Sequence, residues 1–120
     1  CVGMQLMFES SEEGNVACLG LLPGRVQRLR VGDDLPVPHM GWNQLELRRD
    51  SPLLKDIRSG DYVYFVHSYA APASDLTLAT SEYGEHFSAI VQRDNVFGVQ
   101  FHPERSAKVG AQLLKNFLQL

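Results

Sequence analysis

The uncharged run Tyr62-Val63-Tyr64-Phe65-Val66 decides the fold class of this 120-residue chain. Consecutive β-branched and aromatic residues without a charge are typical of a strand with both faces covered, so we expect a central strand within Asp61 to Tyr69. Residues 76–80, 87–92 and 96–102 read as further strands. Asp94-Asn95 supplies turn residues that join the last two as a hairpin.

Helical patterns lie on both sides of these strands. Met4, Met7 and Phe8 have i, i+3, i+4 spacing, which predicts a helix from about Val2 to Ser10. Ser106 is expected to cap a final helix that packs an apolar stripe on the sheet. The members of this stripe are Val109, Leu113 and Phe117, with Leu114 and Leu118 beside them.

The segment between the first helix and the central strand contains weaker signals. Residues 26–31 and 45–47 indicate short strands, and Ser51-Pro52 opens a short helix that we expect to end at Gly60. Residues 37–43 predict an irregular loop, because Pro36 and Pro38 each remove a backbone donor. A helix, mixed strands and a helix together predict an α/β fold.

A mixed sheet covered on both faces needs more strands and helices than 120 residues supply. We therefore expect residues 1–120 to be the C-terminal portion of a single domain, whose other strands precede Cys1. We also expect the chain to need that N-terminal segment for stability.

Composition excludes several classes of function. The formal net charge is -3 and the 11 Lys and Arg residues are scattered, which argues against nucleic acid as a partner. The longest apolar run is far below the roughly 20 residues that cross a membrane. Two cysteines make no disulfide framework, so we expect reduced thiols and a cytoplasmic location. The four histidines lack metal-ligand spacing, and no glycine motif for a phosphate or cofactor occurs.

Two stretches supply the parts of a thiol nucleophile site. Cys1-Val2-Gly3 fits a nucleophile at the start of a helix, where amide N–H groups favour a thiolate and the Val2 N–H could hold an oxyanion. His102 could act as base and acid, and Glu104, two residues later, could orient it. A Cys-His-carboxylate triad follows if the chain ends meet.

The residues also resemble a known family. Cys1-Val2-Gly3-Met4-Gln5 is similar to the nucleophile elbow of the class I (triad) glutamine amidotransferases, and the stretch 98–104 is similar to their His-Pro-Glu motif. Residues 38–43 and 64–69 resemble one branch of that family, whose glutaminase subunits work with a (β/α)₈-barrel cyclase in histidine biosynthesis. The resemblance covers essentially the whole chain and implies the three-layer glutaminase fold with a mixed central sheet.

The resemblance implies roles for particular residues. Cys1 would attack the glutamine side-chain amide, with His102 as base and acid and Glu104 as the orienting carboxylate. Gln5, Glu13 and the backbone of Ser68 and Tyr69 would hold glutamine, and the ammonia formed would pass to the cyclase. The residues expected to face that partner are Pro38, His39, Met40, Gly41, Trp42, Asn43, Tyr64 and Arg105. The family also has a glycine-rich oxyanion loop before the cysteine, which this sequence lacks.

Other interpretations remain open at this point. A terminal Cys1 could use its own α-amine as base, although this leaves the His-Pro-Glu motif without a function. A cysteine peptidase would use the same groups on a peptide, and another class I amidotransferase would use them on glutamine. The chain could also be a non-catalytic fragment that only binds the partner.

Overall fold

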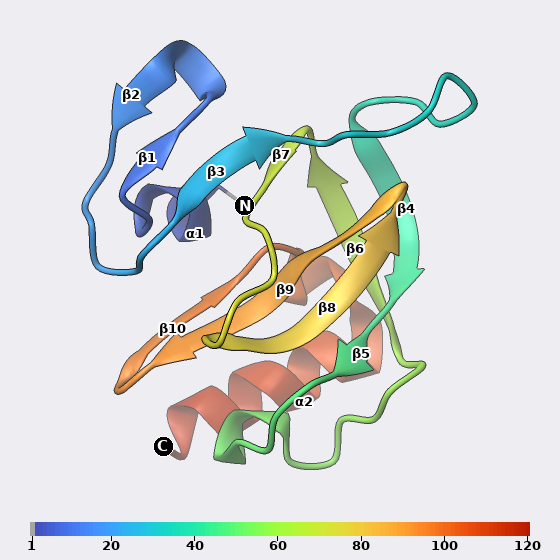
Figure 1. The fold of residues 1–120 in the computed structure, drawn as a ribbon. Coiled ribbons are helices and arrows are strands. Elements are labelled where there is room, and N and C mark those ends of the chain that lie inside the picture. The colour runs from blue at the N-terminus through green and yellow to red at the C-terminus, as the bar shows by residue number, and fades with distance from the viewer. Residues whose placement is uncertain (1) are drawn as a thin grey trace.

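The computed structural model describes residues 2–120, which form an α/β fold of three small sheets and two α-helices (Figure 1). The α/β class predicted from the sequence is confirmed. The helices are α1 (Val2–Leu6), α2 (Ala107–Leu118) and the 3₁₀ turns η1 (Glu13–Asn15), η2 (Pro52–Leu54) and η3 (Pro103–Arg105). The strands are β1 (Ser10–Ser11), β2 (Val16–Ala17), β3 (Arg25–Arg28), β4 (His39–Gln44), β5 (Glu46–Leu47), β6 (Tyr62–His67), β7 (Tyr69–Ala70), β8 (Thr77–Tyr83), β9 (Glu85–Arg93) and β10 (Val96–Val99).

The sheets differ in the direction of their strands. The sheet β2-β1-β3-β7 is mixed, since β1 runs parallel to β3 while the other pairs are antiparallel. The sheet β10-β9-β8-β5 and the pair β4-β6 are antiparallel throughout. In Figure 1 the mixed sheet and α1 form one end of the molecule, and α2 lies at the other end.

The strand predicted at the centre of the sequence is present as β6, but only one of its faces is fully covered. Val63, Phe65 and His67 are buried, while Tyr62 on the other face is 53% exposed. Its partner is β4, so the prediction of an irregular loop over residues 37–43 is wrong. Pro36 and Pro38 precede β4, so the donors they lack fall outside the ladder.

The hairpins at the C-terminal end follow the turn signals of the sequence. The β9–β10 hairpin is confirmed, and Asp94 occupies the left-handed region at its turn. The β8–β9 hairpin turns at Gly84, whose φ is +75°. A Cβ at Gly84 would lie 2.7 Å from a Val31 methyl, so the turn requires glycine for both conformation and space.

Three of the shorter predicted elements end earlier than expected. Helix α1 stops at Leu6, because the chain then turns so that Ser10 and Ser11 pair with both β2 and β3. Strand β3 covers only residues 25–28. Ser51 does cap η2 by accepting a hydrogen bond from the Leu53 N–H, but η2 ends at Leu54, well before Gly60.

The final helix uses only part of its apolar stripe. Leu113 is buried in the main core, whereas Phe117 and Leu118 are 51% and 82% exposed. In the C-terminal half of α2, the Asn116 Nδ2 donates to the carbonyl oxygens of Leu53 and Lys55 at 2.9 and 2.7 Å, and Phe117 meets Phe97 edge to face at 6.1 Å between ring centroids. A buried amide with two acceptors therefore adds to the smaller apolar contact of this half of the helix.

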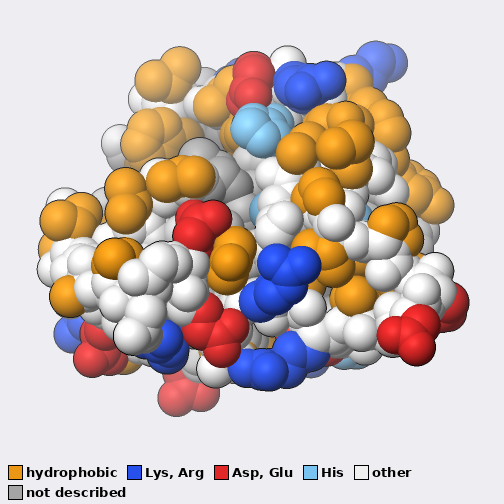
Figure 2. Space-filling model, turned by 90° about the horizontal axis from the view of Figure 1, so that it is seen from above, with side chains coloured by type: hydrophobic (Ala, Val, Ile, Leu, Met, Phe, Trp, Pro, Cys, Tyr) orange, Lys and Arg blue, Asp and Glu red, His pale blue; other side chains and the backbone are white. Residues whose placement is uncertain are grey.

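Two apolar clusters fill the interior. The larger one joins α2, β6, β8 and β9 around Phe65, Phe87 and Phe101, and the smaller one joins α1 to β3 around Met4 and Val26. On the face shown in Figure 2, apolar side chains gather in groups, and acidic and basic side chains are interspersed along one edge. Among the described residues, no helix is both long and apolar enough to cross a membrane.

Candidate active site

A small cavity collects most of the catalytic and substrate-binding residues predicted from the sequence. Its volume is about 220 Å³, which is smaller than the roughly 300–1,000 Å³ of pockets for drug-sized ligands and suits a molecule the size of an amino acid. Four segments far apart in the chain meet there: α1, η1, the turn between β6 and β7, and the residue before η3. The lining residues are Val2, Gln5, Glu13, Val66, His67, Ser68, Tyr69 and His102.

His102 and Glu104 form the pair that the sequence predicted. The His102 Nδ1 and Glu104 Oε1 atoms are 2.8 Å apart. His102 has extended backbone, but Pro103 begins a 3₁₀ turn, so the two side chains meet across a tight turn and not along a strand end as expected. Because a carboxylate only accepts, Nδ1 is the donor, and the neutral ring keeps its lone pair on Nε2. Nε2 is therefore the nitrogen that can accept a proton.

The Glu104 carboxyl favours its charged form. Its pKa is lowered, first by a hydrogen bond from its own backbone N–H and then by the hydrogen bond and charge of His102 and by the Arg105 guanidinium. An ionised carboxylate at this position stabilises an imidazolium at His102. The pair can accordingly take up and release a proton at the cavity wall.

A buried hydroxyl fixes the backbone of His102. Ser106 was expected to cap α2, but its side chain makes no capping bond. Its Oγ donates to the His102 carbonyl at 2.7 Å and accepts from the Tyr64 N–H at 3.0 Å. The His102 N–H in turn donates to the Tyr64 carbonyl at 3.0 Å. The sequence did not predict these two hydrogen bonds of the Ser106 hydroxyl, because Ser106 also fits the simpler role of a helix cap.

Gly110 allows α2 to approach this turn. A Cβ at Gly110 would lie 1.8 Å from the Pro103 carbonyl oxygen, so only glycine fits at this position of the helix. The Gly110 N–H donates to the Ser106 carbonyl at 3.2 Å. The position of the His-Pro-Glu turn thus depends on a helix residue outside the lining of the cavity.

Gln5 and Tyr69 are joined at the wall of the cavity. The Gln5 Nε2 donates to the Tyr69 carbonyl at 2.9 Å and to the Gln100 Oε1 at 3.0 Å, and Gln5 is buried. The same Tyr69 carbonyl lies 2.9 Å from the His67 Nδ1. Glu13 is exposed at the rim, on η1. The expectation that these residues hold a substrate remains a prediction.

The predicted nucleophile, Cys1, lies outside the described residues. Val2, the predicted oxyanion donor, opens α1 and lines the cavity. The structure therefore brings His102, Val2 and Glu13 to one cavity, and the role of Cys1 there remains a prediction.

The residues predicted to face a partner divide between the two faces of the β4–β6 pair. Met40 and Trp42 are 63% and 52% exposed, and Trp42 meets Tyr64 edge to face at 5.8 Å between ring centroids. The Arg105 guanidinium lies over the Tyr64 ring, 4.6 Å from its centroid. Pro38, next to β4, is exposed, and Gly41 and Asn43 are half-buried.

His39 does not belong to this exposed face. It is only 3% exposed and stacks between Phe65 and Tyr83, so it makes no direct contact with a partner in this arrangement. The alternation of side chains along β4 places it inside. The sequence segment was read as a loop, in which no such alternation holds, so the burial of His39 was not foreseen, and its role toward a partner remains a prediction.

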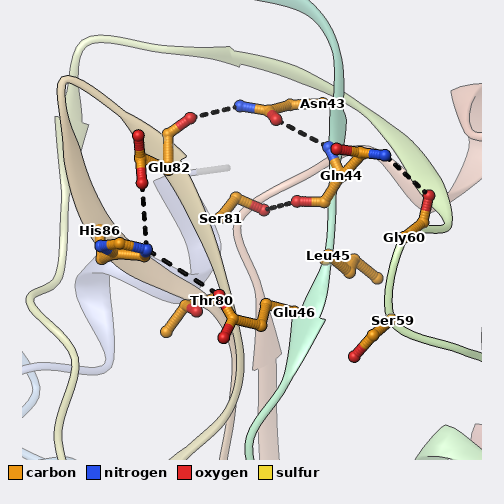
Figure 3. A pocket seen from close by; sticks show the side chains of 10 residues that line it. All are labelled: Asn43, Gln44, Leu45, Glu46, Ser59, Gly60, Thr80, Ser81, Glu82 and His86. Carbon is orange, nitrogen blue, oxygen red and sulfur yellow. Dashed lines mark hydrogen bonds and ion pairs between the residues drawn. The ribbon is translucent and has the colours of Figure 1, made fainter.

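A second, larger cavity of about 480 Å³ lies between β4–β5 and the β8–β9 hairpin (Figure 3). His86 Nε2 lies 3.2 Å from Glu82 and 3.9 Å from Glu46 there. Figure 3 shows Glu82 and His86 on the β8–β9 hairpin, and Glu46 approaching His86 from the β4–β5 segment that also carries Asn43 and Gln44. No group of described residues in the chain is suited to hold a metal ion.

Comparisons with known proteins agree on one family. The model of the family "Glutamine amidotransferase class-I" matches residues 1–120. A protein of Xylella fastidiosa (strain Temecula1) named "Imidazole glycerol phosphate synthase subunit HisH" is 56% identical over 120 residues. Two further proteins are each 52% identical: "Imidazole glycerol phosphate synthase subunit HisH 2" of Legionella pneumophila (strain Paris), over 120 residues, and the subunit HisH of Vibrio parahaemolyticus, over 126 residues. All three cover 100% of this chain, which spans about 60% of their own length.

Proposed function

Because this chain belongs to the class I glutamine amidotransferase family, we propose that it carries the glutaminase site of an imidazole glycerol phosphate synthase. The observation that supports this most is the cavity in which His102, backed by Glu104, faces Gln5, Glu13 and the β6–β7 turn. Relatives that bear the subunit name match the whole chain.

The proposed reaction is hydrolysis of glutamine to glutamate and ammonia. Cys1 gives its thiol proton to Nε2 of His102, and the sulfur attacks the side-chain amide carbon. The C–N bond breaks as His102 protonates the leaving nitrogen, which departs as ammonia and leaves a thioester. Water, deprotonated by His102, then hydrolyses the thioester and restores the thiol.

Electrostatics support the roles of the other residues. Glu13 supplies a carboxylate at the rim that suits the α-ammonium group of glutamine. The Val2 N–H is proposed as an oxyanion donor, and loss of one such donor typically costs roughly 10²- to 10³-fold in kcat. A second donor would come from an N-terminal segment of the same domain, of which we propose that residues 1–120 form the C-terminal part.

The partner proposed for this chain is a (β/α)₈-barrel cyclase subunit that receives the ammonia, in histidine biosynthesis. Its docking surface is the exposed face of β4–β6, with Met40, Trp42, Tyr62, Tyr64 and Arg105. Exposed aromatic and arginine side chains gathered on one face are typical of interface centres. A cytoplasmic location belongs to the same proposal and agrees with the small number of cysteines.

The test is a glutaminase assay on the complete polypeptide together with its cyclase. We expect glutamate release that His102→Ala abolishes. Activity that survives His102→Ala would favour an α-amine base at Cys1, and cleavage of peptides in preference to glutamine would favour a peptidase. Binding of the cyclase without glutamate release would favour a non-catalytic subunit.

A further inference from the structure

A pair of buried histidines connects the partner-facing strand to the wall of the candidate site. His39 on β4 lies directly opposite His67 on β6 in the ladder, so both rings point to the same, inner face. The His39 Nδ1 and His67 Nε2 atoms are 3.0 Å apart, and the two residues are 3% and 6% exposed. We call His39 and His67 the histidine pair.

The hydrogen bonds of the histidine pair run in one direction only. The Tyr69 carbonyl can only accept, so the His67 Nδ1, 2.9 Å away, must be the donor. In the neutral ring Nε2 is then an acceptor, and it receives the proton of the His39 Nδ1. The His39 Nε2 is left as an acceptor for the Asn43 Nδ2 at 3.4 Å. Each ring thus has one defined tautomer.

Both ends of this chain of hydrogen bonds lie at cavities. Tyr69 and His67 line the proposed glutamine cavity, where the Tyr69 carbonyl also accepts from Gln5. At the other end, the Asn43 Nδ2 also donates to the Glu82 carbonyl at 2.7 Å, at the cavity drawn in Figure 3. This series of hydrogen bonds therefore extends from β4 and β8 to the β6–β7 turn.

Packing does not explain the choice of histidine at these positions. The rings lie among Phe65, Tyr83 and Phe87, with centroid distances of 4.0–5.9 Å. A phenylalanine would fill such a place without a polar atom to satisfy. Burial also lowers the pKa of each ring to about 4, so both rings are neutral near pH 7. Two neutral rings keep the defined donors and acceptors described above.

We propose that the histidine pair positions the Tyr69 carbonyl, and with it the β6–β7 wall of the cavity, so that glutamine binds. His67 and His39 are positioning residues in this account, since they act through Tyr69 and not on the reacting atoms. The proposal rests on the proposed glutaminase function. It predicts that loss of the His67 donor raises KM for glutamine while kcat changes little, because the His102–Glu104 pair is not disturbed.

The test compares two substitutions of His67 with opposite defects. In His67→Asn the amide Nδ2 takes the place of Nδ1 and keeps a donor for Tyr69, whereas His67→Phe keeps the aromatic packing and loses the donor. We expect His67→Phe to raise KM for glutamine at least tenfold and His67→Asn to keep KM much closer to the wild-type value. In both variants kcat should stay within about threefold of the wild-type value. If KM follows packing, so that Phe binds glutamine as well as or better than Asn, the proposal is wrong.

A second pair covers the case in which a His67 variant does not fold. His39→Asn keeps a donor for the His67 Nε2, and His39→Phe keeps the stacking on Phe65 and Tyr83. The same order of KM is expected, and the reverse order contradicts the proposal. All variants are measured in the complete polypeptide with its cyclase.

An independent readout separates this proposal from the proposed function. Nitrogen-15 NMR of the histidine rings at pH 7 should show two neutral rings protonated at Nδ1, in hydrogen bonds. A wild-type complex that releases no glutamate contradicts the proposed function, whatever the tautomers are. An active wild-type complex in which either ring is protonated at Nε2 contradicts the positioning role alone.

Discussion

Substitution of Gly110 by alanine tests whether helix α2 sets the position of the His-Pro-Glu turn. The new Cβ would lie 1.8 Å from the Pro103 carbonyl oxygen and 2.7 Å from its carbon. Since carbon and oxygen atoms in contact lie about 3.3 Å apart or more, α2 or the turn must move by about 1.5 Å. The neighbouring His102 and Glu104 would move with the turn.

Two opposing effects determine the stability of this variant. Alanine is a better helix former than glycine by about 1 kcal/mol, which alone would stabilise α2. Overpacking of a buried position costs about 1–3 kcal/mol, and here the obstacle is backbone, which cannot rotate away. We therefore expect Gly110→Ala to lower the free energy of unfolding. A displacement of about 1 Å at catalytic groups can cost roughly 10²-fold in rate, so kcat/KM should fall by a similar factor.

The assay combines urea unfolding with glutamate release by the complex with the cyclase. The control is Ala111→Gly at the next, exposed position of α2, which should lose about 1 kcal/mol of stability and keep its activity. A Gly110→Ala variant that is as active as the wild type and unfolds at the same or a higher urea concentration would show that α2 does not set the position of the turn.

Two further substitutions and one pH series test the role of Glu104, the docking face on β4–β6 and the histidine pair. Glu104→Gln should lower kcat by roughly 10²-fold with little change in KM, because the neutral amide stabilises an imidazolium at His102 less well; unchanged kcat would exclude this role. Trp42→Ala should weaken cyclase binding at least tenfold in a titration, whereas Leu118→Ala, at an 82% exposed residue on α2, should not; equal effects would contradict a docking face on β4–β6. The histidine pair should make unfolding pH-dependent, because the pKa of each ring is about 4 in the folded state against an ordinary value of 6.5. Between these two values the unfolded state binds more protons than the folded state. The free energy of unfolding should therefore fall by about 3 kcal/mol per ring as the pH drops from 6.5 to 4. Melting temperatures that stay constant over that range, or that fall equally in His39→Phe, would contradict this prediction.

The parts of the site predicted from sequence are those carried by short, local patterns. His102-Pro103-Glu104 keeps its two side chains within reach whatever the rest of the chain does, because the separation is only two residues. The strand at residues 62–67 and the turn at Asp94-Asn95 were predicted for the same reason, since β-branched runs and turn residues act locally.

The parts that were missed depend on pairing between distant segments. Residues 37–43 contain Pro38 and directly follow Pro36, so they read as a loop, and only the ladder with β6 makes most of them a strand. That ladder turns His39 inward and Trp42 outward, which no pattern within the segment itself specifies. Ser106 fits a helix cap locally, and its clamp on His102 requires Tyr64, 42 residues earlier. Strand register and tertiary hydrogen bonds therefore determine the strand at β4, the direction of its side chains and the partners of Ser106, which local propensity does not determine.

In the proposed glutaminase mechanism His102, oriented by Glu104, serves Cys1 in glutamine hydrolysis. The most direct measurement incubates the complete polypeptide and its cyclase with glutamine and quantifies glutamate and the mass of the protein, for the wild type and for His102→Ala. We predict steady glutamate release by the wild type and none by His102→Ala. Any transient increase in the mass of the protein should lie on Cys1, where the thioester forms. Equal glutamate release by both proteins, or none by the wild-type complex, would contradict this mechanism.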